Sequence, residues 1–218
     1  MERICYWCGK EAASDEHVPS KGLFPPGHRK NLLTVPSCFS HNNAFGETDD
    51  KVRVYLQAAQ SNQVALAAWK DKTIRGLNRP ESRGFANELA DSSVAIEEPD
   101  GNIVGGVFAA RGTLLQPYFE KTTRALYFHL TGRPSLDCEV RYYSRNFFGR
   151  DDLPKLDLLE RTFQELSSEV GPGENPEVFQ WRTKTTGSFF VLEMIFYEGV
   201  VVYGLIDLRQ LKQAVGEG

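Results

Sequence analysis

Long apolar segments are absent from this chain of 218 residues. Its most apolar stretch, residues 189–206, is interrupted by two glutamates and two glycines, which leaves it too polar to span a bilayer. The first residues lead into no apolar core of the kind that a secretory signal needs. These absences predict a cytoplasmic protein that does not enter a membrane.

An excess of positive charge is absent as well. The 25 lysines and arginines are outnumbered by 29 aspartates and glutamates, which gives a net charge of -4 at pH 7. Without a global basic field, nucleic-acid binding has to depend on local patches. Two basic runs are candidates, and each is either such a patch or an ordinary solvated surface. The first is Lys70, Lys72, Arg75, Arg79 and Arg83, and the second, interleaved with aromatic residues, is Arg141, Arg145 and Arg150.

Cysteine is scarce too, with four in the chain. Because thiols stay reduced in the cytoplasm, these cysteines favour metal binding over disulfides. Cys5 and Cys8 are separated by two residues, and so are Cys38 and His41. This spacing lets one metal ion bind both members of each pair, and three thiolates with one imidazole make a closed, structural zinc site. Cys138 lies outside the pairs and is expected to be a buried, inert thiol.

Hydrophobic periodicity predicts an α+β fold in three parts. A zinc module over residues 1–58 needs a metal staple, because so small a unit buries little apolar surface. A helical connector over residues 59–90 follows, in which Pro80 ends a helix. Residues 91–218 are expected to form an α+β domain with a mainly antiparallel sheet. Expected helices cover residues 39–59, 61–76, 115–130 and 153–170, and expected strands cover residues 93–96, 103–109, 139–143, 178–183, 188–196 and 200–206, with Glu198 and Gly199 at the last turn.

Several short motifs around the metal ligands agree in order and spacing with a known family. They are Cys5-x-x-Cys8-Gly9, Asp15-Glu16-His17-Val18-Pro19, Leu23-Phe24-Pro25, Asn31-Leu32 and Val35-Pro36-Ser37-Cys38-x-x-His41-Asn42-Asn43. Together they resemble the HNH endonucleases, which are zinc-stabilised ββα-metal nucleases. The resemblance covers about the first 55 residues, roughly a quarter of the chain. It implies a hairpin and a helix that together grip a phosphate group.

The resemblance also implies roles for four residues. His17 would be the general base, since a neutral imidazole accepts a proton from water near pH 7. Glu16 would bind a catalytic divalent cation, Mg²⁺ or Mn²⁺, because these ions prefer oxygen ligands. Asn31 would take the central position of the motif and hold the His17 loop by hydrogen bonds. Asn42 would take the third position, on the side of the catalytic metal.

Departures from the family pattern leave alternatives open. His41 stands where the commoner pattern has cysteine, so a rival interpretation makes His41 the catalytic third position and leaves the zinc site incomplete. Ser20 stands where relatives often have a second proline, with no expected loss of chemistry. Asp49 and Asp50 are interpreted as a solvated helix face, or alternatively as residues that tune the site. Nucleic-acid contacts are expected from Lys21, Arg29 and Lys30.

The leading hypothesis is therefore a metal-dependent endonuclease that acts on DNA, of the kind often found in restriction or anti-phage defence. A second hypothesis is a zinc-stabilised module that binds nucleic acid or protein without cleaving it, in which Glu16 and His17 belong to an ordinary surface loop. A third is a nuclease subunit whose residues 91–218 dock a protein partner or a second copy of the chain.

Overall fold

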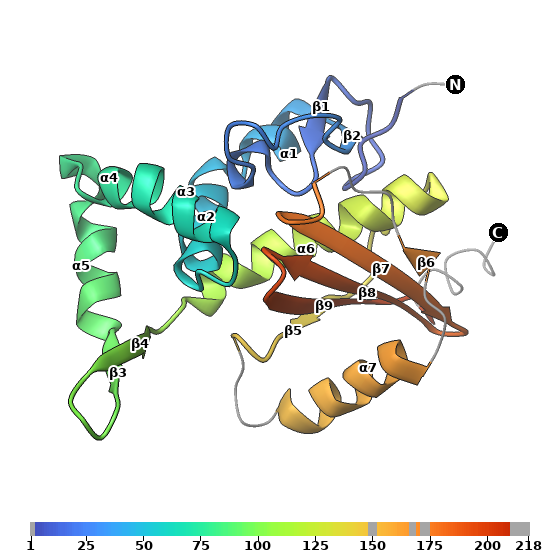
Figure 1. The fold of residues 1–218 in the computed structure, drawn as a ribbon. Coiled ribbons are helices and arrows are strands. Elements are labelled where there is room, and N and C mark those ends of the chain that lie inside the picture. Colours follow the sequence, from blue (N-terminus) through green and yellow to red (C-terminus); the bar gives the residue numbers. More distant parts are fainter. Residues whose placement is uncertain (1–2, 148–151, 166–168, 171–174, 210–218) are drawn as a thin grey trace.

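The computed structural model of the chain describes residues 3–147, 152–165, 169–170 and 175–209. Its helices and a five-stranded antiparallel sheet form an α+β fold, as the sequence predicts. Figure 1 shows the N-terminal strands above a long helix, the sheet below that helix, and a further helix on the far face of the sheet. Among the described residues, no helix combines the length and apolarity that a membrane span requires.

The N-terminal module is an antiparallel hairpin followed by a helix. Its elements are β1 (Ser14–His17), η1 (Lys21–Leu23), β2 (Thr34–Ser37) and α1 (Phe39–Asn43). In the hairpin, Glu16 lies opposite Val35 and His17 lies opposite Thr34. This β–β–α order agrees with the arrangement that the resemblance implies for the first 55 residues.

An arm of helices and one β-hairpin follows the module (Figure 1). Its elements are α2 (Gly46–Ala58), α3 (Gln63–Ala68), η2 (Trp69–Thr73), α4 (Ile74–Leu77), η3 (Pro80–Ser82), α5 (Arg83–Ser92), β3 (Val94–Glu97) and β4 (Ile103–Val107). The helix is continuous from α3 to α4. Within it, η2 is a π-helical segment, in which the N–H of Ile74 donates to the carbonyl of Trp69 five residues earlier. Such widened turns recur at functional sites.

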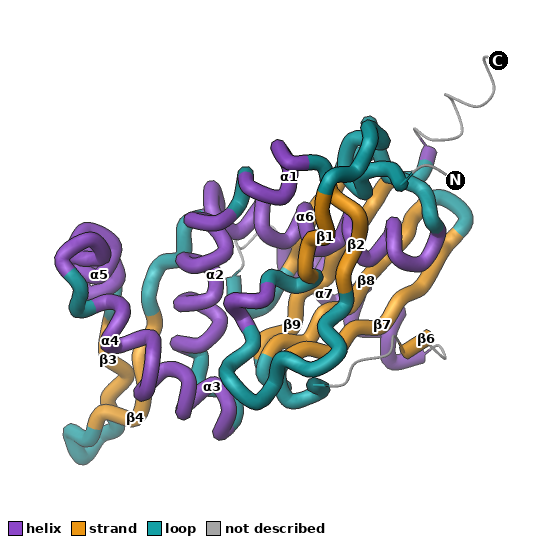
Figure 2. Tube along the Cα trace, turned by 90° about the horizontal axis from the view of Figure 1, so that it is seen from above, coloured by secondary structure: helices purple, strands orange, loops and turns teal. Residues whose placement is uncertain are grey.

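The remaining elements form a layered unit around the sheet. They are α6 (Gly112–Thr131), β5 (Val140–Tyr143), α7 (Leu153–Glu165), β6 (Glu169–Val170), β7 (Phe179–Thr186), β8 (Phe189–Phe196) and β9 (Val200–Asp207). The strand order is β5-β9-β8-β7-β6, and each neighbouring pair is antiparallel. Figures 1 and 2 place α6 between the N-terminal hairpin and one face of the sheet.

Each face of the sheet is buried against a different helix. The face toward α6 carries Leu192, Met194 and Val202, which belong to a core that continues into the N-terminal module. The opposite face packs on α7 through a smaller cluster, made of Tyr143, Leu156, Phe163, Val191 and Tyr203. At Gly204 of β9 a Cβ atom would lie 2.1 Å from Thr123 Oγ1, so α6 rests directly on the strand at this glycine.

The structure corrects the end of one expected helix. The helix expected over residues 153–170 covers Leu153–Glu165, and residues 169–170 instead pair with β7 as strand β6. The last turn lies between Phe196 of β8 and Val200 of β9, so it contains the predicted Glu198 and Gly199 together with Tyr197. Cys138 is buried, as expected. Arg150 of the second basic run lies outside the described residues.

Candidate metal centre and active site

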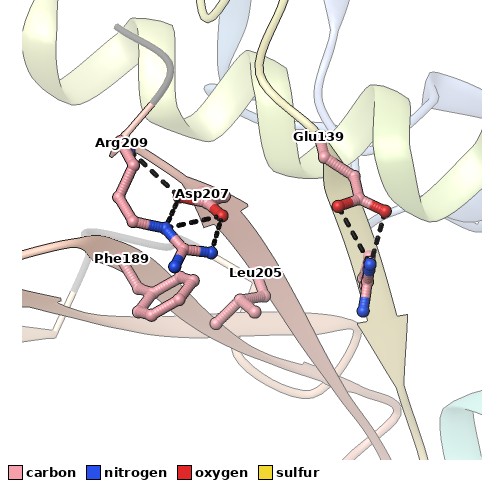
Figure 3. A pocket seen from close by; sticks show the side chains of 6 residues that line it. Glu139, Phe189, Leu205, Asp207 and Arg209 are labelled. Carbon is pink, nitrogen blue, oxygen red and sulfur yellow. Dashed lines mark hydrogen bonds and ion pairs between the residues drawn. The ribbon is translucent and has the colours of Figure 1, made fainter. Parts of the chain in front are cut away.

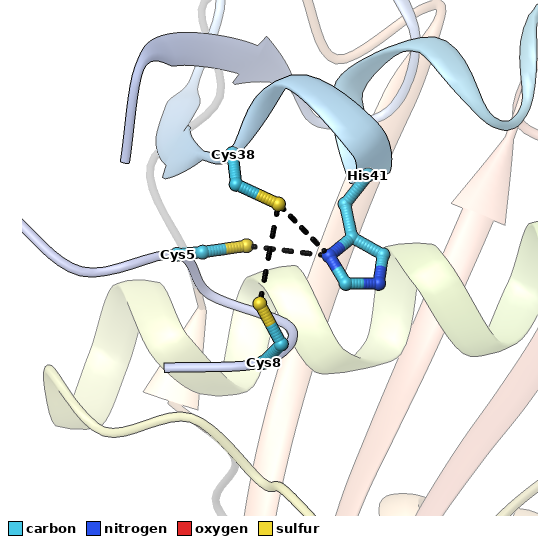
Figure 4. Close-up of side chains that lie close together, drawn as sticks. All are labelled: Cys5, Cys8, Cys38 and His41. Atoms are coloured by element: carbon cyan, nitrogen blue, oxygen red, sulfur yellow. Dashed lines mark hydrogen bonds between the residues drawn. The ribbon is translucent and has the colours of Figure 1, made fainter. Parts of the chain in front are cut away.

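The four expected zinc ligands lie together beside the hairpin, with their ligand atoms within 4.8 Å of one another (Figure 4). His41 Nδ1 is 3.2 Å from Cys38 Sγ and 3.7 Å from Cys5 Sγ, and the Sγ atoms of Cys8 and Cys38 are 3.9 Å apart. A tetrahedral zinc ion with bonds of about 2.0–2.3 Å has edges of about 3.5–3.8 Å, whereas a disulfide needs about 2.05 Å. The spacing therefore fits one structural zinc ion and not a disulfide.

Local backbone geometry positions the members of each ligand pair on the same side of the chain. Gly9 adopts a φ of 70°, which favours glycine, and its N–H donates to the Cys5 carbonyl at 2.9 Å. Cys38 directly precedes α1, so His41 lies three residues later on the same side of the first helical turn. Burial acts to raise the pKa of the Cys5 thiol, but backbone N–H groups around it prevail and lower that pKa. The sequence spacing thus becomes a compact cage.

The His41 imidazole is held by an aromatic neighbour. The Trp7 ring stacks on it with centroids 5.4 Å apart and an interplanar angle of 18°, and the Arg124 guanidinium lies 5.1 Å from the Trp7 ring centroid. Burial lowers the pKa of His41, and the charge of Lys10 lowers it further, so the ring is neutral near pH 7. A neutral imidazole is the form that binds zinc. This placement agrees with the assignment of His41 to zinc.

Glu16 is not open to solvent, because its carboxylate forms a buried ion pair with Lys121 of α6. Lys121 Nζ lies 3.1 Å from Glu16 Oε1 and 2.9 and 2.7 Å from the two carboxylate oxygens of Asp49 in α2. The side chains of Lys121 and Glu16 are 3% and 7% exposed. The Phe45 ring centroid is 5.3 Å from the same ammonium. One buried cation therefore joins β1, α2 and α6.

The two neighbouring aspartates of α2 have different environments. Asp50 has a side chain that is 75% exposed, as expected for a solvated helix face, but that of Asp49 is 16% exposed and faces Lys121. Burial raises the pKa of both Glu16 and Asp49, and the charge of Lys121 opposes this in each case. Because two carboxylates share one ammonium, the cluster depends on Lys121 to keep its charges in the interior.

The residues as arranged do not fit a divalent cation at Glu16. One oxygen, Glu16 Oε2, is buried and accepts no hydrogen bond among the described residues, so its lone pairs are free to bind a metal ion. However, Lys121 Nζ lies 3.1 Å from the other oxygen of that carboxylate. At an effective dielectric constant of about 20, a divalent ion about 4 Å from an ammonium is repelled by about 8 kcal/mol. Mg²⁺ or Mn²⁺ is therefore incompatible with Glu16 while Lys121 occupies this position.

His17 ends β1, and its side chain is half-buried. Since successive side chains of a strand point to opposite faces, its imidazole lies on the face opposite to Glu16. Burial lowers the pKa of His17 and the nearby charge of Lys21 lowers it further, while Asp15 opposes the shift. The ring is consequently neutral near pH 7 and able to accept a proton.

The two asparagines of the motif lie toward opposite ends of the hairpin. Asn42 Nδ2 donates to Ser14 Oγ at 2.8 Å, which ties α1 to the start of β1. Asn31 is an exposed loop residue with a φ of 46°, three residues before Thr34, the partner of His17. The Cα atoms of Ser14 and His17 are about 10 Å apart along the strand. Asn42 thus lies on the face of β1 that carries Glu16, whereas Asn31 lies at the end that carries His17.

The three residues expected to contact nucleic acid are all exposed on the segment between β1 and β2. Lys21 begins η1 close enough to His17 to affect its pKa. Arg29 Nε donates to the Phe24 carbonyl at 2.8 Å, which fixes the base of its side chain. The Lys30 carbonyl accepts a hydrogen bond from Asn175 at 3.2 Å. Positive charge therefore borders the His17 end of the hairpin.

Sequence reasoning missed Lys121 and Arg124, the buried cations of α6. A signal existed, because Lys121 lies three residues after Tyr118 and four before Ala125, on the apolar face of the predicted helix. Lysine is almost never fully buried unless it is paired. The sequence does not tell which carboxylates are its partners, since Glu16 is 105 residues away.

A cavity at the edge of the sheet is lined by charged side chains that are already paired with one another. It is a cavity of about 180 Å³ lined by two ion pairs and the apolar residues Phe189 and Leu205 (Figure 3). Arg141 pairs with Glu139 and Arg209 pairs with Asp207. Arg145, nearby in sequence, bonds two carboxylates of α7. The described arginines of the second basic run thus have carboxylate partners, which favours the interpretation as a solvated surface.

Comparison of the chain with protein-family models, with curated proteins and with solved structures found no match.

Proposed function

We propose that this protein is an HNH-type endonuclease that hydrolyses phosphodiester bonds in DNA. The observation that supports this most is the position of His17. A neutral, half-buried imidazole lies at the end of a hairpin that a zinc cage fixes to its helix, beside the exposed cation of Lys21. This is the combination that phosphodiester hydrolysis by a positioned base requires.

In this proposal His17 accepts a proton from the attacking water as the water oxygen bonds to phosphorus. The P–O bond to the leaving sugar oxygen breaks, and that oxygen takes a proton from the solvent. Lys21, together with Arg29 and Lys30 on the same loop, attracts the phosphate group toward the imidazole. The zinc ion takes no part in the reaction, because four protein ligands leave it no open position. Its contribution is to fix α1 against the hairpin so that β1 presents His17 in one orientation.

The resemblance expects Mg²⁺ or Mn²⁺ on Glu16 and Asn42, but the Glu16 carboxylate is occupied by Lys121. No step of the reaction is therefore assigned to this ion. The setting in restriction or anti-phage defence rests only on what such nucleases often do.

The test is plasmid nicking by zinc-loaded protein with no added metal, with Mg²⁺ and with Mn²⁺. A chelator is avoided, since it would also remove the structural zinc. We expect nicking that His17→Ala slows by about 10²–10⁴, the usual cost of losing a general base. His129→Ala, which removes an exposed histidine of α6, is the matched control and should cut normally. Equal nicking by His17→Ala and the original protein would overturn the proposal.

A second candidate function is a module that binds nucleic acid without cutting it. The observation that favours it is the Lys121 ammonium, which neutralises Glu16 at the position where a nuclease would need a metal ion. Such a module would bind DNA equally well with and without His17 and would show no metal-dependent nicking. A nuclease that works only inside a larger assembly would be separated from both by the mass of the complex in solution.

A further inference from the structure

Four cations from four separate segments converge beside one cleft. The cleft has a volume of about 640 Å³, and Arg53 of α2, Lys72 of η2 and Arg79, just before η3, line it. Arg29, from the segment before β2, does not line the cleft but is near enough for its charge to affect Lys72. Burial lowers the pKa of Lys72, the positive charges of Arg53, Arg29 and Arg79 lower it further, and the charge of Asp50 opposes the shift. We call this surface the Lys72 cleft.

Lys72 belongs to the π-helical segment η2. It is exposed at the cleft, whereas its neighbour Thr73 is buried. Arg53 Nη1 donates to Thr73 Oγ1 at 3.0 Å and to Gln57 Oε1 at 3.3 Å. The Arg53 guanidinium is therefore held in place before any ligand arrives. Fixed cations bind an anion without first losing side-chain freedom.

The charges of the Lys72 cleft are incompletely paired. Glu47 pairs with Lys51, Asp50 lies 3.5 Å from Arg53, and a third carboxylate, Glu81, also lines the cleft. In the described part of the chain, by contrast, Lys72, Arg79 and Arg29 form no ion pair with a carboxylate, within a limit of 4.0 Å. Three cations that repel one another are thus kept together on a protein of net charge -4. An anion of several charges would relieve this repulsion.

The Lys72 cleft adjoins the His17 end of the module. A Cβ atom on Gly22 of η1 would lie 3.9 Å from Asp50 Oδ1, so η1 contacts α2 at the edge of the cleft. Lys21, the preceding residue, is the one whose charge acts on His17. Lys72 also borders a second cleft of about 630 Å³, lined in part by Phe24 and Pro25 of the same segment. A chain-like anion passing His17 would continue into this region.

From these contacts we propose that the Lys72 cleft holds the phosphodiester backbone of double-stranded DNA next to the point of attack at His17. Lys72, Arg79 and Arg29 contact consecutive phosphates, and they position the duplex without reading its sequence. The choice of DNA rests on the proposed function, but the binding itself does not require cleavage. The first basic run therefore contains a binding surface, unlike the second.

Fluorescence anisotropy with a labelled 30-base-pair duplex tests this, using zinc-loaded protein that carries His17→Ala and no chelator. Adding Lys72→Ala and Arg79→Ala should weaken binding by at least tenfold near 100 mM salt. It should also reduce the slope of log Kd against log salt by about 2, since each phosphate contact contributes about 0.9. The matched control is Lys155→Ala with Arg161→Ala, two exposed cations of α7, which should change Kd by less than threefold.

Equal weakening in both double variants would overturn the proposal, and so would an unchanged salt slope in the cleft variant. Inorganic phosphate and pyrophosphate form a separate arm. Competition by either at micromolar concentration would indicate a small-anion site and would also overturn the assignment to a DNA backbone. If the cleft variant loses binding but the original protein never nicks DNA, this inference stands and the nuclease proposal fails. If nicking depends on His17 but not on Lys72 or Arg79, the nuclease proposal stands and this inference fails.

Discussion

The N-terminal module and the sheet domain, which consists of β5 to β9 with α7, are stabilised in different ways, although both pack on α6. The sheet buries continuous apolar faces, with residues such as Leu192, Met194 and Val202 fully inaccessible to solvent. The module adds apolar residues to the same core, but it also contains four side chains placed to hold one metal ion and the buried ion pair of Glu16 with Lys121. Apolar packing tolerates small changes, whereas polar and metal clusters fail when one partner is removed. We therefore expect the module to be more sensitive to single substitutions than the sheet.

Removing a zinc ligand should produce the largest difference in stability between the module and the sheet. Cys8→Ser, Cys38→Ser or His41→Ala leaves three ligands, and structural zinc contributes folding free energy on the order of 10 kcal/mol in small modules. We expect loss of zinc and of amide protection in residues 3–45, while β7, β8 and β9 remain protected. Zinc analysis and hydrogen exchange measure this. Unchanged zinc content and melting temperature in all three variants would show that the cage does not hold the module together.

Removing the shared cation should have the next largest effect. Lys121→Met leaves the carboxylates of Glu16 and Asp49 buried without a counter-ion, which typically costs about 3–5 kcal/mol. Urea unfolding measures the loss. The matched control adds Glu16→Gln and Asp49→Asn to the same chain and should recover most of it. A loss below about 1 kcal/mol, or no recovery, would mean that the ion pair is not what secures the module to α6.

The sheet domain can be tested where α6 rests on β9. Gly204→Ala would place a Cβ atom against Thr123, and overpacking of this kind typically costs about 1–3 kcal/mol. Gly112→Ala at the start of α6 is the control, because no heavy atom lies within 4 Å of the added methyl group. Thermal unfolding should show a lower melting temperature for the first variant only. Similar melting temperatures would indicate that β9 and α6 can move apart at little cost.

The smallest effects should come from two neighbouring residues of α1. His41→Cys restores the commoner four-ligand set and should retain zinc, because a thiolate binds zinc as an imidazole does. Asn42→Ala removes the hydrogen bond to Ser14 and should cost about 1 kcal/mol with zinc content unchanged. Zinc content and nicking rate are measured on both. A folded, zinc-replete and inactive His41→Cys protein would instead favour the rival interpretation, in which His41 serves the reaction.

Local pattern predicted much of the fold and of the zinc centre. Within each ligand pair, Cys5 with Cys8 and Cys38 with His41, the two members are one turn apart. Their spacing is therefore visible in the sequence. The helix expected over residues 115–130 and the strands β7, β8 and β9 were likewise predictable, because the apolar residues that indicate each of them lie within one segment. These features depend on residues near one another in the chain.

Features that depend on distant residues could not be predicted. Nothing near Glu16 indicates that its partner is Lys121, and nothing near Asp49 indicates that it faces inward while Asp50 does not. The Lys72 cleft likewise requires four segments to converge, although its cations lie in a visible basic run. The roles of His17, Asn31 and Asn42 in catalysis remain predictions, since only activity measurements on variants test them.

The two clusters of the module also differ in when they become able to form during synthesis. The zinc ligands span 36 residues, from Cys5 to His41, whereas Glu16 and Lys121 are 105 residues apart. At about 5–20 residues per second, a ribosome needs roughly 4–16 s to add the residues between His41 and Lys121. During that interval a nascent chain is able to capture zinc while the Glu16 carboxylate stays hydrated. Glu16 leaves water only when α6 arrives with its ammonium.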